Sequence, residues 1–84
     1  MKGGLRIQHK YIVVKSTYKN GAAKRTAFGI AAVEEYDGIT TVLESISDIS
    51  SDAKAVKRLV RLCNEHQLSL IHLREVVSDF LAII

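Results

Sequence analysis

Few residues of this 84-residue chain could do chemistry. Cys63 and His66 are three positions apart, a spacing that would let one helix present a thiolate and an imidazole to a metal ion. A structural zinc site needs four ligands with close local pairs, and the sequence contains one Cys. We therefore interpret Cys63 as a small core hydrophobe and His66 as part of a polar helix end, and we expect neither a metal nor another cofactor.

A second group of polar residues lies near the end of the sequence. His72, Glu75 and Asp79 recur at spacings of 3 and 4, which on a helix places them along one side. A carboxylate beside an imidazole is the minimum for general acid–base catalysis. The same pattern is common on a solvated helix face, and no glycine-rich loop or nucleophile motif accompanies it. The sequence therefore favours a protein that is not an enzyme.

Four cations form the most regular polar pattern in the chain. Lys54, Lys57, Arg58 and Arg61 fall at i, i+3, i+4 and i+7, so they line the side of a helix opposite its apolar stripe. Three interpretations of this basic stripe stay open. It is a solvated face whose side-chain stems shield apolar surface, a contact for nucleic-acid phosphates, or a contact for an acidic protein surface.

Charge is divided unevenly along the chain. Residues 1–33 hold seven Lys or Arg and no carboxylate, a net charge of +7, whereas residues 34–84 hold five bases against nine acids, a net charge of −4. An anionic partner would account for the basic half, and so would strands that carry Lys on solvated edges. If the partner is a nucleic acid, Lys24 and Arg25 are expected to contribute with the basic stripe.

Turn chemistry indicates the elements that position these residues. Runs of β-branched and aromatic residues are separated by Asn20-Gly21 and by Asp37-Gly38. Both dipeptides are strong hairpin signals because their residues tolerate the positive φ of a tight turn. The sequence therefore predicts a three-stranded antiparallel β-meander over residues 5–46.

The hydrophobic period then changes to the 3 and 4 spacing of helices. Ser50-Ser51-Asp52 is typical of a helix start and predicts a first helix over residues 50–66, and Ser69 predicts a second over residues 69–83. Strands followed by helices indicate an α+β fold with both helices packed on one sheet face. A chain of this length supports one core, so residues 1–84 are predicted to form a single domain.

Two helices can cover only one face of the predicted sheet. Strict alternation sends the side chains of Ile12 and Val14 to the same face, and whichever face the helices leave open keeps apolar groups. The sequence also closes on the apolar pair Ile83-Ile84, which we expect to dock. A homodimer or another protein would cover such surfaces, so these four residues are the expected oligomer contacts.

Composition bears on the compartment. A single Cys, the lack of a charged-then-apolar leader and the lack of an apolar run of about 20 residues lead us to expect a cytoplasmic protein that makes no contact with a membrane.

Four segments carry a resemblance to a known group of proteins: Phe28-Gly29-Ile30, Ile46 to Ser50, Leu62-Cys63-Asn64 and Leu68 to Leu81. With them, roughly residues 8–82 resemble a family of short, uncharacterised bacterial proteins, a domain of unknown function, from anaerobic Gram-positive bacteria and their mobile elements. The resemblance implies no activity, ligand or catalytic residue, and it lowers the expectation of an enzyme.

Two functional hypotheses follow. In the first, the chain is a small protein-binding module or inhibitor. If it comes from a phage or other mobile element, its size and charge would suit an inhibitor of a host defence nuclease of the anti-CRISPR type. In the second, it is a regulator that binds nucleic acid without sequence preference, through the basic stripe and the basic N-terminal strands.

Overall fold

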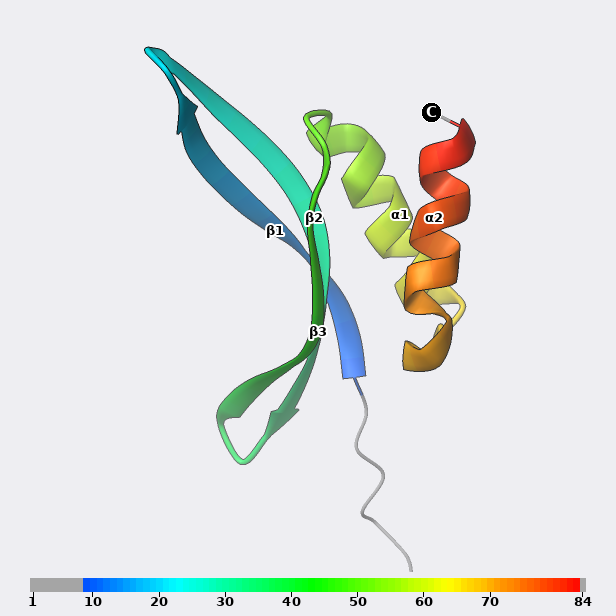
Figure 1. The fold of residues 1–84 in the computed structure, drawn as a ribbon. Helices are drawn as coiled ribbons and strands as arrows, with labels where there is room; N and C mark the ends of the chain where they lie inside the picture. Colours follow the sequence, from blue (N-terminus) through cyan, green and yellow to red (C-terminus); the bar gives the residue numbers. More distant parts are fainter. Residues whose placement is uncertain (1–8, 84) are drawn as a thin grey trace, which may run out of the picture.

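Three antiparallel strands form one open sheet in the order β1-β2-β3, and both helices lie on the same side of it (Figure 1). The computed structural model describes residues 9–83. The elements follow the chain as β1 (His9–Asn20), β2 (Ala23–Tyr36), β3 (Ile39–Ser50), α1 (Ala53–Glu65), a 3₁₀ turn η1 (Leu70–His72) and α2 (Leu73–Ile83). The predicted α+β fold, a meander followed by two helices, is confirmed.

Both hairpin turns have the backbone conformation that their residues favour. Asp37 and Gly38 have φ of 55° and 78°, as the two central positions of a type I′ turn require. The first turn lies one residue later than the Asn-Gly signal suggests, because Asn20 still pairs with Ala23 and the loop is Gly21-Ala22. Gly21 has a φ of 68°, which fits a type II′ turn with Gly at its first central position.

β3 is longer than predicted, and a bulge explains its extra length. The predicted meander ended at residue 46, but β3 continues to Ser50. Three residues of β3 stand opposite Gly29 of β2, where the pairing shifts register. A side chain on Gly29 would overlap the carbonyl oxygen of Ile46, and its Cβ would lie 2.7 Å from the Cα of Ser47. The missing side chain of Gly29 therefore lets the bulged strand pass close to β2.

The helix boundaries differ from the prediction for local reasons. The first helix, predicted over residues 50–66, begins at Ala53 because the side chain of Asp52 caps it and accepts a hydrogen bond from the backbone N–H of Lys54 at 3.0 Å. The second, predicted from residue 69, begins with the 3₁₀ turn, and Ser69 makes no side-chain cap. Residues 5–8 of the predicted meander lie outside the described residues.

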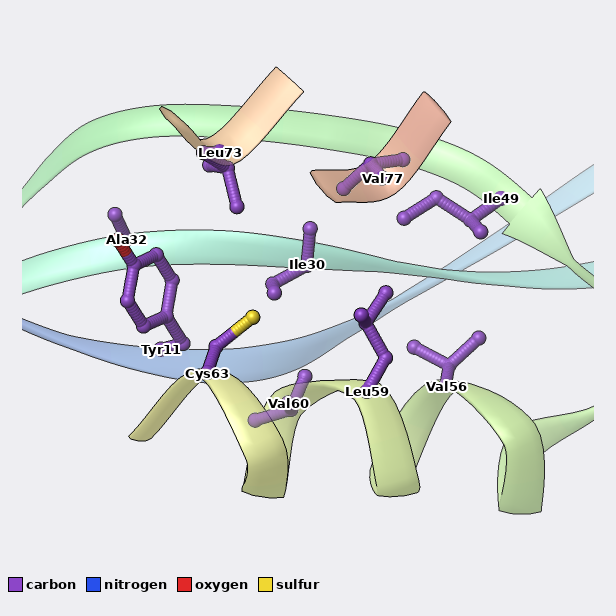
Figure 2. Close-up of a cluster of buried hydrophobic side chains, with 10 residues drawn as sticks. All are labelled: Tyr11, Ile30, Ala32, Ile49, Val56, Leu59, Val60, Cys63, Leu73 and Val77. Atoms are coloured by element: carbon purple, nitrogen blue, oxygen red, sulfur yellow. The ribbon is translucent and has the colours of Figure 1, made fainter. Parts of the chain in front are cut away.

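The core lies between the sheet and the two helices. Figure 2 shows Ile30 of β2 between side chains from both helices, with Leu73 and Val77 of α2 on one side and Leu59 of α1 on the other. Ile30 and Leu73 are fully buried. Burying such a side chain stabilises the fold by roughly 1.5–3 kcal/mol. Leu59 belongs to the apolar side of α1, and Leu73 and Val77 belong to that of α2, as the helical spacing predicts.

A pair of hydrogen bonds joins β1 to the end of α1. The side chain of Asn64 accepts from the backbone N–H of Tyr11 at 2.8 Å and donates to the backbone C=O of Tyr11 at 2.9 Å. The Asn64 amide thus bonds the outer edge of β1 as a neighbouring strand would. It fixes α1 against β1 and blocks that edge at Tyr11.

The close passage of β3 over Gly29 leads to a stability prediction. We expect Gly29→Ala to lower the free energy of unfolding by about 1–3 kcal/mol, because the added Cβ forces two backbones apart. Gly21→Ala is the control, since its Cβ would meet nothing within 4 Å and only the positive φ is strained. Urea unfolding measures both, and a smaller loss for Gly29→Ala than for Gly21→Ala would contradict the packing explanation.

Candidate functional site

The basic stripe lies on the side of α1 that faces away from the core. Lys54, Lys57, Arg58 and Arg61 are all exposed and line one open depression of the surface. On the opposite side of the helix, the residues that pack into the core are Val56, Leu59, Val60 and Cys63. The sequence spacing therefore placed the four cations correctly on one surface.

The stripe has little ion pairing of its own. Arg61 Nε lies 4.0 Å from Glu65 Oε2, and both side chains are largely exposed, so this pair stabilises the chain little. In the described residues no carboxylate forms an ion pair with Lys54, Lys57 or Arg58. Four neighbouring cations in water can attract phosphate or carboxylate groups.

Lys24 and Arg25 lie apart from this stripe. Both are exposed and belong to the first residues of β2, at the end of the β1–β2 hairpin. In Figure 1 this hairpin end projects away from the helices. The depression on α1 is lined by the stripe alone. The structure therefore divides the predicted partner-binding cations into two separate surfaces.

The sheet face away from the helices carries the predicted contacts Ile12 and Val14. Ile12 is 37% exposed and pairs with Ala31, and Val14 is half-buried. Val42 of β3, which the prediction missed, is 59% exposed and pairs with Val33 on the same face. The sequence could have indicated Val42, because side chains alternate between the two faces from the Asp37-Gly38 turn onward.

The oligomer contact predicted at the C-terminus lies on a different surface. Ile83 is 83% exposed at the end of α2, on the other side of the sheet from Ile12. Ile84 lies outside the described residues. The structure therefore does not bring the expected oligomer contacts together on one surface.

The residues considered for acid–base chemistry lie in water. His72, Glu75 and Asp79 are all exposed, with His72 in η1 and the two carboxylates on α2. Among residues 9–83, no three His, Cys, Asp or Glu side chains converge as metal ligands would. His66 is exposed while Cys63 is buried, and burial raises the pKa of the Cys63 thiol. The absence of catalysis stays a prediction.

A polar cluster that the sequence did not reveal joins β1 to the segment between the helices. The Tyr11 hydroxyl donates to the backbone C=O of Leu68 at 2.7 Å, and His9 Nε2 lies 3.0 Å from the same oxygen. The two rings meet edge to face with centroids 5.3 Å apart. Burial raises the pKa of the Tyr11 phenol, and so, to a smaller extent, does electrostatic repulsion from Cys63 when it is ionised in alkali and from the Glu44 carboxylate. This cluster anchors the loop after α1.

The raised pKa values of Cys63 and Tyr11 predict a loss of stability in alkali. The unfolded chain ionises these groups near their ordinary pKa values of 9.0 and 10.0, whereas the folded chain holds them protonated. Their stabilising contribution is present below pH 9 and is lost as the pH rises through the folded pKa values. We expect the urea midpoint to fall from pH 8 to pH 10 in the wild-type chain under reducing conditions.

The Cys63→Ala variant separates the contribution of the Cys63 thiol to this pH dependence from that of Tyr11. This variant should be less stable at pH 8 because it leaves a cavity, yet its midpoint should fall less between pH 8 and pH 10. An equal fall in both chains would show that Cys63 does not contribute to the pH dependence.

Within the described residues 9–83, no helix is long and apolar enough to cross a membrane. A comparison with curated proteins and another with solved structures found no match. The sequence profile of one family, described as a family of unknown function (DUF6514), matches residues 2–83. This match covers nearly the whole chain and agrees with the resemblance to a domain of unknown function. The chain belongs to the DUF6514 family of unknown function.

Proposed function

We propose that this chain is a small protein-binding module or inhibitor, and not an enzyme, that acts through the sheet face away from the helices. One observation carries the proposal. Ile12 and Val42 are 37% and 59% exposed on a face that no other described element covers. Exposed apolar groups gathered on one surface favour association with another protein.

The composition of this face supports a protein partner over a small molecule. Its floor is the central strand, where Ala27, Ala31 and Val33 are buried beneath the side chains of the flanking strands. An apolar centre on rigid strands presents a preorganised surface, which lowers the entropy lost on binding. Charged residues at the margins would steer the partner and select its orientation.

The basic stripe supports a second candidate function. Four exposed cations line one depression on α1, and within residues 9–83 the one ion pair that they form is long and exposed. Such a surface suits the phosphates of nucleic acid, which need no base-specific contact. In this alternative the chain is a nucleic-acid-binding regulator without sequence preference.

The biological setting forms part of the proposal. We propose a cytoplasmic protein of an anaerobic Gram-positive bacterium or of one of its mobile elements. In a mobile element, a small binding protein of this kind would suit an inhibitor of a host defence nuclease. Genes adjacent to members of this family test the setting, since defence genes or phage genes nearby would favour it.

Substitution of Ile12 tests the protein-binding hypothesis. The immobilised chain is exposed to lysate of its source organism in 0.5 M salt, and retained proteins are quantified by mass spectrometry. We expect Ile12→Asp to reduce retention of the specific partner more than tenfold, because a carboxylate interrupts the apolar surface. Leu62→Asp on α1 is the matched control, since Leu62 is 43% exposed. Equal retention by both variants would contradict use of this face.

Salt dependence tests the nucleic-acid hypothesis. If the stripe neutralises four phosphates of a duplex, affinity should fall about 100-fold between about 50 and 200 mM salt. Lys57→Gln with Arg58→Gln should roughly halve the slope of log affinity against log salt. Ser78→Glu with Ala82→Glu removes the same net charge at two exposed positions of α2 and should leave the slope unchanged. Fluorescence anisotropy gives the slopes, and equal slopes for both variants would exclude the stripe.

A further inference from the structure

The outer edge of β3 is an unpaired sheet edge. β3 pairs with β2 alone, and within residues 9–83 no backbone hydrogen bond leads from its outer side to another element. Its residues from Ile39 to Leu43 carry no charge, and the whole strand contains neither Lys nor Pro. Natural edge strands usually carry such residues because an uncharged edge recruits another strand.

The other edge of the sheet is protected. β1 carries Lys10, Lys15 and Lys19, and the Asn64 amide bonds both backbone groups of Tyr11. Lysine side chains and an occupied backbone both oppose the addition of a strand. β3 is interrupted by two bulges, which also oppose strand addition, but it has neither the lysines nor the occupied backbone of β1, so β3 is the edge more open to pairing.

The two ends of the sheet carry opposite charges. The β1–β2 hairpin end has three exposed cations, Lys19, Lys24 and Arg25, and Lys19 stands directly opposite Lys24 in the strand pair. Like charges in this position repel. The β2–β3 hairpin end instead has Glu34, Glu35 and Asp37. Among the described residues, none of these charges takes part in an ion pair. Figure 1 shows the two ends projecting beyond the helices in opposite directions.

From these observations we infer that a second copy of this chain pairs with β3, antiparallel and about a twofold axis, to form one six-stranded sheet. When the two β3 strands run antiparallel, opposite ends of the two sheets lie side by side. The acidic β2–β3 hairpin of one copy is then at the same end of the dimer as the basic β1–β2 hairpin of the other. Charges that form no ion pair within the described residues of one chain then attract opposite charges across the dimer. The two β2 strands are three strand spacings apart, roughly 14 Å, so this attraction is effective at low salt. The occupant of the edge is therefore a second copy of this chain.

Pairing of β3 with itself is favoured over pairing of β3 with β1. A β3–β1 contact is head to tail, does not close, and would have to displace Asn64 from Tyr11. A β3–β3 contact closes as a dimer. Glu44, which two copies would bring near each other, is already neutralised because Arg74 Nε lies 2.7 Å from its Oε2. The β3–β3 pair therefore brings no carboxylates without an ion-pair partner together at its centre.

The inference rests on the proposed function only in that both assign the chain a role based on protein contact. It uses the β3 edge, whereas the proposed partner uses the sheet face around Ile12. A monomeric chain that still retains a partner through Ile12 would overturn the dimer alone. A dimer that retains no partner would overturn the proposed function alone.

The first test compares two lysine substitutions by sedimentation equilibrium of the full chain. We expect a wild-type dimer at 100 µM and a dissociation constant at least tenfold higher for Val42→Lys, which puts a charge on the pairing strand. Ile12→Lys, on the same sheet face but on β1, should leave the dimer intact. Circular dichroism confirms that each variant is folded. A wild-type monomer at 1 mM, or a dimer lost in Ile12→Lys and kept in Val42→Lys, would overturn the inference.

The second test exchanges the charges of the hairpin ends. Lys24→Glu with Arg25→Glu makes both ends acidic, and Glu35→Lys with Asp37→Lys makes both ends basic. Each variant alone should dimerise at least tenfold more weakly than the wild type at low salt. An equimolar mixture should form a heterodimer with nearly wild-type affinity, because unlike ends then meet. A mixture that stays as weak as its components would show that the ends do not meet across the twofold axis.

Amide hydrogen exchange locates the contact independently of any substitution. Residues 40–46 of β3 should exchange more slowly at 200 µM than at 2 µM, because pairing protects outward N–H groups. Residues 10–16 of β1 should show no such concentration dependence. The reverse pattern would place the contact on β1 and overturn the assignment to β3.

Discussion

The central strand β2 is buried on both of its faces, although the helices cover only one of them. Toward the helices, Ile30 is fully buried by large aliphatic side chains. On the other face no helix is present, and burial is achieved with small residues, because Ala27 and Ala31 need little cover from the flanking strands. Gly29 has no side chain on this face, so the bulge of β3 can pass close to the backbone of β2. The outer residues of that face then stay partly in water, which is why a candidate contact surface exists at all.

Local chemistry was sufficient to predict the order and type of the elements. Asp37-Gly38 forms its predicted turn, since both residues adopt a positive φ at low cost. The helical stripes were predictable because burial follows the 3 and 4 spacing on α1 and α2. The basic stripe was predictable for the same reason, since a surface that lies on one helix depends only on residues close in the sequence.

Features that depend on distant residues were not predictable. The segment from Ser47 to Ser50 reads as turn and cap residues, yet it continues β3 because Gly29, about 20 positions earlier, leaves room for a bulge. The pairing of Asn64 with Tyr11 spans 53 positions, and no periodicity indicates it. Lys24 and Arg25 could be assigned to a strand but not to a surface, because only the path of the hairpin separates them from α1.

The two candidate functions use opposite sides of the molecule. The basic stripe lies on the outer side of α1, the core lies between α1 and the sheet, and Ile12 and Val42 lie on the far face of the sheet. A ligand on one side would not sterically exclude a ligand on the other. Any coupling between them would have to pass through core contacts such as those of Ile30, and a packed core amplifies small displacements when it has two stable arrangements. Protein contact through the sheet and phosphate contact through α1 are therefore physically compatible in one chain.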